Sequence, residues 1–309
     1  MIFHIPFTNE DVVRADATPV TPELYARSKH AGIEALVYFQ EDYLKPLVQG
    51  LLSRSDRDRA ILTTYYRTMG YVLSILRLDA PWHFQSISSA ARSTMELYLD
   101  LILLTRDTTS ESTERFHAFT RVERFRVATE IAKFFDANPD EKHDDIAVQR
   151  ALAGDANSKA EIEALIEKWW GRDRKGKLRR PGHWSTYGDV RSRAKALGSS
   201  YEAKYVRFGY QLSWHVHSGA MGVAGIEKES FHTFVGLAHG LVIETAIDTF
   251  RIVCRELHFD RVIPDLNEKL DFLGRVPGLR LVDLRLMAQG GAQRFTFVEA
   301  GRGAPAGAG

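Results

Sequence analysis

The chain lacks the features that mark several protein classes. It has a single cysteine, Cys254, so this sequence can form neither an intramolecular disulfide nor a thiolate zinc cluster. Its most apolar windows, 97–104 and 234–250, are interrupted by charged or histidine residues and fall short of the roughly 18 apolar residues of a membrane span. The first residues have no basic region or apolar run like those of a secretory signal. We therefore expect a cytoplasmic protein with no membrane association.

The chain also lacks an excess of positive or negative charge. The net charge is +1 in 309 residues, so no field of the whole molecule attracts nucleic acid or anionic lipid. A partner of that kind would have to bind a local patch. Hydrophobic residues make up 44% and charged residues 26% of the chain, which is ordinary for a globular protein and argues against general disorder.

What the sequence does contain is helix after helix. Start signals include a proline after a capping residue at Thr21-Pro22-Glu23, a start at 138–141, and capping boxes at Thr108…Glu111, Ser158…Glu161 and Ser199…Glu202. Together with apolar residues at helical spacing, they predict helices over about 21–46, 57–78, 84–105, 108–135, 158–170, 199–218 and 230–258.

The predicted fold class is all-α, a multi-helix bundle with a small extended appendage and a disordered C-terminal tail. A short strand is expected at 295–298, and we hypothesise that it pairs with residues 2–7. The tail is rich in glycine and alanine and has little to bury. The expected segments are an extended N-terminus at 1–20, the bundle at 21–260, an appendage at 261–299 and the tail at 300–309.

The most informative stretch runs from 205 to 218. Read at helical spacing, it places Tyr205, Gly209, Ser213 and His217 in one line, each four residues after the last. A glycine in that line permits close approach of another helix. A serine and a histidine one turn apart indicate either a satisfied polar core or a site.

A second helix carries an ion pair in apolar surroundings. Arg92 and Glu96 are one turn apart, so they share a face, and most of their neighbours on the helix are apolar. We expect this pair to be at least partly buried, where it needs further hydrogen-bonding partners. Ser213, His217 and Tyr205 are the natural candidates, so we predict that Arg92, Glu96, Ser213 and His217 converge.

These residues also carry a resemblance to a known family. The pattern R-S-x-x-E, a tryptophan, and then Y-x7-S-x3-H-S resembles the bacterial domain of unknown function 5677 over about residues 30–255. The matching residues are Arg92, Ser93, Glu96, Trp184, Tyr205, Ser213, His217 and Ser218. The resemblance implies an α-helical fold and says little about activity.

Three interpretations of this cluster stay open. The first is a structural polar network that fixes helix register. The second is metal-independent RNA cleavage, as in helical nucleases of bacterial defence and toxin systems. There His217 would be the general acid or base, Arg92 would stabilise phosphate charge and Glu96 would orient one of them. The third is hydrolysis with Ser213 as nucleophile, although an i to i+4 pair on a regular helix aims the hydroxyl poorly.

No cofactor and no metal are assigned. His215 and His217 are two residues apart, so on a helix they point in different directions and suit a metal ion poorly. We count His215 only as a supporting residue. Glu96 and His217 could meet His183 or His239 in space, but no spacing in the sequence demonstrates it.

The remaining candidate is a basic segment at 171–183, which lies between tryptophans and is expected to be an exposed, mobile loop without regular secondary structure. Its cations are Arg172, Arg174, Lys175, Lys177, Arg179 and Arg180. Cations with flanking aromatics suit nucleic-acid backbones and stacked bases, and the alternative is a solvated loop.

The sequence therefore favours a nucleic-acid-directed protein of defence or toxin type, with a ribonuclease as one form. A non-catalytic helical module that binds a protein partner or small ligand is the alternative, and a homo-oligomer is compatible with both.

Overall fold

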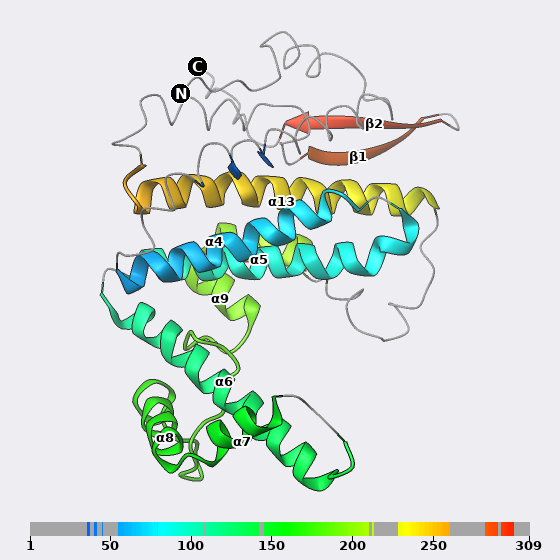
Figure 1. The fold of residues 1–309 in the computed structure, drawn as a ribbon. Helices are drawn as coiled ribbons and strands as arrows, with labels where there is room; N and C mark the ends of the chain where they lie inside the picture. Colours follow the sequence, from blue (N-terminus) through cyan, green and yellow to red (C-terminus); the bar gives the residue numbers. More distant parts are fainter. Residues whose placement is uncertain are drawn as a thin grey trace. The chain divides into compact units, whose positions relative to one another are not determined.

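A computed structural model gives the fold of the chain (Figure 1). It describes residues 36, 37, 40, 41, 45, 55–78, 80–107, 109–141, 145–209, 212, 228–259, 282–289 and 292–299. The chain divides into two compact units, one formed by Met1–Thr105 with Leu197–Gly309 and the other by Arg106–Ala196. We call them the first and the second unit.

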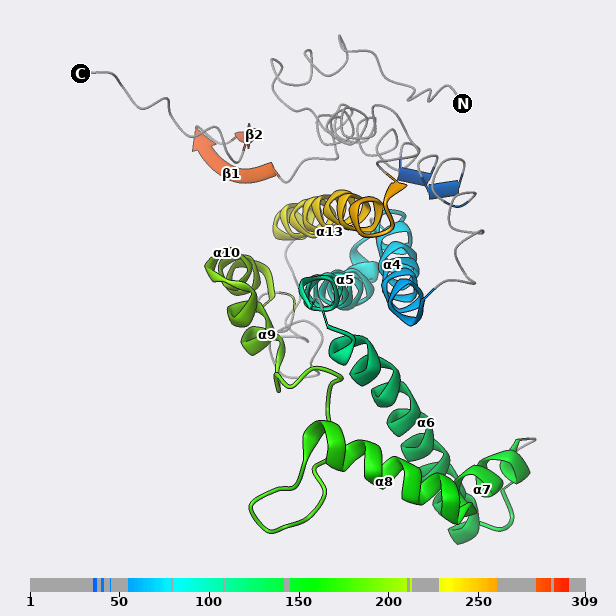
Figure 2. The same cartoon turned by 90° about the vertical axis from the view of Figure 1, so that its left-hand side faces the viewer.

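Within the described residues, three long helices build the first unit. They are α4 (Asp56–Ile75), α5 (Phe84–Arg106) and α13 (Lys228–Glu256), and they lie side by side in both ribbon views (Figures 1 and 2). Their facing sides are apolar and fully buried, for example Met69 on α4, Ile87 on α5 and Phe250 on α13. The all-α fold predicted from helical periodicity is confirmed.

Local sequence signals set where these helices begin. Ser55 caps α4, because its hydroxyl accepts a hydrogen bond from the backbone N–H of Asp58 at 3.1 Å. The short 3-10 turn η2 (Pro81–His83) precedes α5, and Nδ1 of His83 accepts from the N–H of Ala80 at 3.2 Å. The expected helices over 57–78 and 84–105 therefore match α4 and α5 closely.

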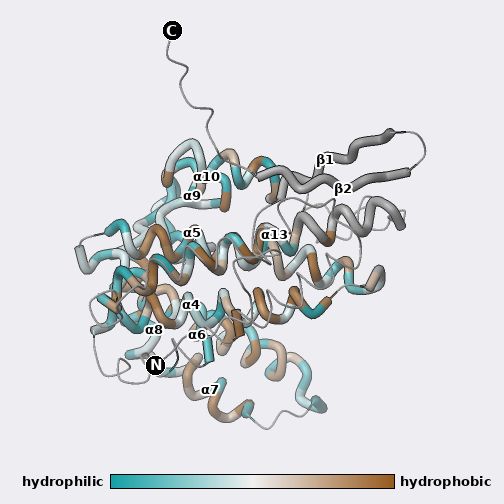
Figure 3. Tube along the Cα trace, turned by 90° about the horizontal axis from the view of Figure 1, so that it is seen from above, coloured by the Kyte–Doolittle hydropathy of each residue, from teal (hydrophilic) through white to brown (hydrophobic). Residues whose placement is uncertain are grey.

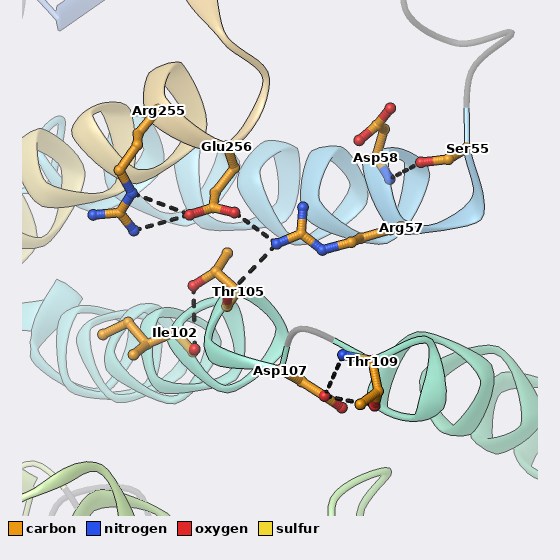
Figure 4. A network of polar contacts seen from close by, with 9 residues as sticks. All are labelled: Ser55, Arg57, Asp58, Ile102, Thr105, Asp107, Thr109, Arg255 and Glu256. Carbon is orange, nitrogen blue, oxygen red and sulfur yellow. Dashed lines mark hydrogen bonds and ion pairs between the residues drawn. The ribbon is translucent and has the colours of Figure 1, made fainter.

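One polar cluster joins the ends of all three helices (Figure 4). Arg57 on α4 donates from Nη2 to Oε2 of Glu256 on α13 at 2.6 Å. The same nitrogen lies 3.5 Å from the carbonyl oxygen of Thr105 at the end of α5. An arginine therefore neutralises carbonyl dipole and carboxylate charge at the helix C-termini.

The second unit contains α6 (Glu111–Ala137), α7 (Ile146–Gly154), α8 (Ala156–Trp170) and most of α9 (Val190–Leu197) (Figure 2). The start predicted at Ser158 is wrong, because Asp155 caps α8 by accepting from the N–H groups of Asn157 and Ser158. The start predicted at 138–141 is also wrong, since that stretch is the turn after α6. Although α7 is rich in hydrophobic residues (Figure 3), none of its residues is buried.

Near the C-terminus, β1 (Val282–Gln289) pairs with β2 (Ala292–Glu299) as an antiparallel hairpin. The strand expected at 295–298 is present, and its described partner is β1; residues 2–7 lie outside the described part of the chain. The segments at 1–20 and 300–309 also lie outside it. Among the described helices, none is long and apolar enough to cross a membrane.

Candidate functional site

The Arg92–Glu96 pair lies on α5 as the sequence predicts. Nε of Arg92 donates to Oε1 of Glu96 at 2.8 Å, and the two side chains are 28% and 29% exposed. The adjacent face of α5 is apolar, with Ala91 and Met95 buried. The pair is therefore partly buried, as expected, and it keeps an open side toward solvent.

The line of residues that begins at Tyr205 is described only in part. After α10 (Ser199–Lys204) the chain continues as a π-helical turn, η3 (Tyr205–Gly209), and not as the regular α-helix that we expected. A π-turn inside a helix is rare and often occurs near functional sites. Ser213, His215 and His217 lie outside the described residues, so their predicted convergence with Arg92 and Glu96 stays a prediction.

Gly209 lies in a crowded position. A Cβ atom at this position would lie 2.5 Å from Cδ2 of the Tyr205 ring and 3.0 Å from Cε of Met95 on α5. Real Cβ atoms do not approach a ring so closely, so a side chain at this position would have to displace the Tyr205 ring, and the Met95 methyl would have to move slightly. Gly209 therefore makes room for neighbouring side chains, whereas close approach of a second helix backbone stays a prediction.

Gly209→Ala should lower the free energy of unfolding by about 1–3 kcal/mol, because the added methyl group overpacks the Tyr205 ring and Met95. Denaturant unfolding measures the change. The matched control is Gly70→Ala in α4, where a Cβ meets nothing within 4 Å. That control should stabilise the protein by about 0.5–1 kcal/mol through helix propensity. Equal effects of the two substitutions would contradict the packing role of Gly209.

A polar cluster that the sequence did not reveal joins α5, α10 and α13. The hydroxyl of Tyr98 donates to Oδ2 of Asp248 at 3.1 Å, and Nζ of Lys204 bonds Oε1 of Glu244 at 2.9 Å. The same ammonium lies 5.2 Å from the centre of the Tyr98 ring, and the Tyr201 ring lies 6.3 Å from it. The sequence contained one indication of this cluster, which is that Glu244 and Asp248 are four residues apart on an otherwise apolar helix.

Burial raises the pKa of Tyr98, and the Asp248 carboxylate beside it adds to that rise. Because the pKa is higher in the folded state, this contribution to stability is complete below the unfolded value of about 10 and is lost as the pH rises above it. We expect the wild type to lose stability above about pH 10, and Tyr98→Phe to reduce that slope by up to about 1.4 kcal/mol per pH unit.

Denaturant unfolding from about pH 8 to pH 11 measures these slopes, a range that spans the pKa of a free tyrosine. The control is Tyr71→Phe on α4, which removes the same hydroxyl from a residue that is 37% exposed and lies outside the Tyr98 cluster. Parallel stability curves for wild type and Tyr98→Phe would show that the phenol does not contribute in this way.

The basic segment of the second unit is exposed, as expected, but it does have regular structure. Its backbone closes into a tight turn, with an isolated β-bridge between Arg172 and Leu178. The N–H of Asp173 donates to the carbonyl of Lys177 at 2.7 Å, and Gly176 adopts the positive φ of 75° that such a turn requires. The expectation of a loop without secondary structure was wrong, because the carboxylate of Asp173 supplies the hydrogen bonds that the turn needs.

The tryptophans beside this turn are engaged elsewhere. Trp169 has Nζ of Lys168 4.2 Å and Cζ of Arg115 5.3 Å from its ring centre. Trp170 packs on Phe119. Trp184 is 3% exposed and packs on Phe116. The stacking platform suggested by the sequence is therefore absent from these three rings, and Trp184 is a core residue of the second unit.

The histidines considered as metal ligands have structural partners. Nη1 of Arg193 lies 2.8 Å from Nε2 of His183, and Nδ1 of His183 lies 2.8 Å from Oγ and 3.1 Å from the backbone nitrogen of Ser185. His239 is 2% exposed, and its Nε2 donates to the carbonyls of Ile75 and Leu78 at the end of α4. No group of metal-ligating side chains occurs within the part of the chain that the structure describes.

A comparison with known families matches residues 58–230, more than half of the chain, to a family described as "Family of unknown function (DUF5677)". The chain belongs to this family. The match agrees with the resemblance seen in the sequence. Searches of curated proteins and of solved structures find no match.

The DUF5677 match runs from α4 through the whole second unit to the start of α13. It therefore includes Arg92, Glu96, the basic turn and the stretch from 205 to 218. Glu244 and Asp248 lie beyond it, so the Tyr98 cluster joins the matched region to the part of α13 that follows that region.

Proposed function

We propose that this DUF5677 protein is nucleic-acid-directed, of the bacterial defence or toxin type, and that it cleaves RNA by metal-independent acid–base chemistry. The observation that carries the proposal is a separation of charge in the second unit. Residues 168–195 hold ten lysines and arginines against two aspartates, whereas residues 106–167 hold nine against fourteen acidic residues. A chain that is nearly neutral overall thus concentrates positive charge on one segment, which is the electrostatic pattern of a phosphate-binding surface.

The roles proposed for the reaction follow from side-chain chemistry. His217 would take the proton from the attacking 2′-hydroxyl, whose oxygen then bonds to phosphorus while the 5′-oxygen leaves with a proton from water. Arg92 would stabilise the charge on the phosphoryl oxygens, and Glu96 would orient its guanidinium. Ser213 would hydrogen-bond within the same site, with Tyr205 and His215 as supporting residues.

The geometry of Arg92 supports its assigned part. The hydrogen bond to Glu96 uses Nε, and within the described residues neither Nη nitrogen of Arg92 makes a hydrogen bond. A guanidinium held at one edge by a carboxylate presents its other donors in a fixed fork, which fits two oxygens of a phosphate. The 28% exposure of the side chain leaves that fork within reach of a ligand.

Incubation of the purified chain with total RNA tests the proposal. We expect cleavage that persists in a chelator and is lost in His217→Ala, as argued in the Discussion. Intact RNA under all conditions would reject the ribonuclease.

One observation favours the alternative of a non-catalytic module that binds a protein partner or small ligand. Val148 and Leu152, one turn apart on α7, are 57% and 46% exposed. Exposed apolar residues on one helix face are typical of a protein-binding surface. Intact RNA together with loss of a protein partner on Val148→Asp substitution would support this alternative.

A further inference from the structure

The turn at 171–180, which we name the basic finger, uses its residues for two separate purposes. One set builds the turn. Oδ1 of Asp173 accepts from the N–H groups of Lys175 at 2.8 Å and Lys177 at 2.9 Å. Arg172 donates from Nε and Nη2 to the carboxylate of Glu167, and from Nη1 to the carbonyl of Gly176 at 3.0 Å. The finger is therefore built by its own acidic residue and by an arginine anchored to α8.

The other set is left exposed. Arg174, Lys175, Lys177 and Arg180 are exposed, and within the described residues none of them pairs with a carboxylate. The one acidic side chain of the finger, Asp173, accepts backbone N–H groups of the turn and forms no ion pair with these cations. Four unpaired cations on a turn that is already formed can bind anions with little loss of conformational entropy.

The surroundings indicate which part of a nucleic acid the finger contacts. Base recognition without sequence preference relies on aromatic rings that are free to stack. Trp169 lies against Lys168 and Arg115, and Trp184 is buried. The available chemistry is positive charge without a stacking platform, which suits phosphates.

We propose that the basic finger binds the phosphodiester backbone of RNA and reads no bases, with Asp173 as its positioning residue. This inference rests on the proposed function in that it names how the RNA is held. Binding should be independent of sequence and should occur with a duplex, whose phosphates are all exposed.

The first test is the salt dependence of binding, measured by fluorescence anisotropy of the full chain with a labelled RNA duplex of about 16 base pairs, the span that shape-reading domains cover. Four phosphate contacts predict a fall in affinity of about 100-fold between 50 and 200 mM salt. Each single alanine substitution at Arg174, Lys175, Lys177 or Arg180 should lower the slope of log K against log salt by about 1.

A quadruple alanine variant of the finger should lose at least about 100-fold in affinity at low salt. The matched control removes the same charge from other exposed positions of the second unit, by alanine substitution at Arg121, Arg124, Lys133 and Lys159. The affinity of that control variant for RNA should fall less than about 10-fold, because only long-range electrostatic attraction is weakened. Equal losses in the two variants would overturn the proposal, because net charge and not the finger would then be responsible.

A pair of substitutions at Asp173 separates position from charge. Both Asp173→Asn and Asp173→Ala remove one negative charge, so attraction alone predicts tighter binding for both. An asparagine oxygen still accepts the two N–H groups, whereas alanine cannot. We expect Asp173→Asn to bind at least as tightly as wild type and Asp173→Ala to bind several-fold more weakly. Tighter binding by Asp173→Ala would overturn the positioning role.

Two further outcomes distinguish this inference from the ribonuclease proposal. If the finger variants lose RNA binding but wild type leaves RNA intact, the binding role of the basic finger is supported and the ribonuclease proposal is rejected. If wild type cleaves RNA and the quadruple finger variant cleaves it with unchanged KM, the ribonuclease proposal is supported and the binding role of the basic finger is rejected. Tyr187, which is 39% exposed, should tolerate alanine without loss of affinity, whereas a loss there would indicate base stacking and overturn backbone-only recognition.

Discussion

His217→Ala should lower the rate of RNA cleavage by about 10²–10⁴-fold, the contribution typical of a general acid or base. A histidine is suited to this part because its pKa lies near neutrality. The measurement is the cleavage of a labelled RNA under single-turnover conditions, which isolates the chemical step from product release. Ser213→Ala should lower the cleavage rate by a smaller factor, because Ser213 is proposed only to form a hydrogen bond within the site.

The same substitution should change thermal stability little. If Arg92 or Glu96 were a buried charge that depended on the histidine, its loss would cost about 3–5 kcal/mol. Arg92 and Glu96 instead bond each other at 2.8 Å and are each more than a quarter exposed, so neither charge is left uncompensated. We therefore expect a change in the free energy of unfolding below about 1 kcal/mol, the upper range for a partly exposed ion pair.

A large loss of melting temperature in His217→Ala, with no cleavage by wild type, would reject the catalytic role and favour a structural polar network. An unchanged cleavage rate in a fully folded His217→Ala protein would equally reject His217 as the general acid or base. The melting curve and the cleavage assay must therefore be measured on the same preparation.

Tyr65→Ala should lower the free energy of unfolding by about 3–5 kcal/mol, the cost of removing a large aromatic side chain from a packed core. Tyr65 is 1% exposed, and its ring lies 5.9 Å from that of Phe250 on α13. Its hydroxyl donates to Oε1 of Gln40 at 2.8 Å, so the substitution also leaves a buried acceptor without its partner. Denaturant unfolding followed by helical circular dichroism measures the effect.

The neighbouring residue provides the matched control. Tyr66 is 37% exposed on the same helix, so Tyr66→Ala removes the same atoms from a position that is only partly covered. It should cost about 0.5–1 kcal/mol. A further variant, Tyr65→Phe, keeps the ring and removes only the hydroxyl, and it should cost about 1–2 kcal/mol. Similar losses for Tyr65→Ala and Tyr66→Ala would show that α4 does not pack as described.

Helix positions follow from local signals, and for that reason they could be predicted from the sequence. The apolar spacing of α4, α5 and α13 repeats every three to four residues, and proline at 81 separates the first two. The Arg92–Glu96 pair was likewise predictable, because residues four apart on a helix always share a face. Helix starts were less predictable where several side chains competed as caps, as Asp155 did with Ser158.

What the sequence alone determined was therefore the helical class, the helix faces and the candidate residues. Only the tertiary structure decided which candidates are engaged elsewhere. It placed Trp184 in a core and gave His239 two carbonyl partners, because burial and hydrogen bonding depend on elements far apart in the chain. It also brought Tyr98, Lys204, Glu244 and Asp248 together from separate helices. Such contacts have no sequence spacing of their own, since packing free energy and not local propensity selects them.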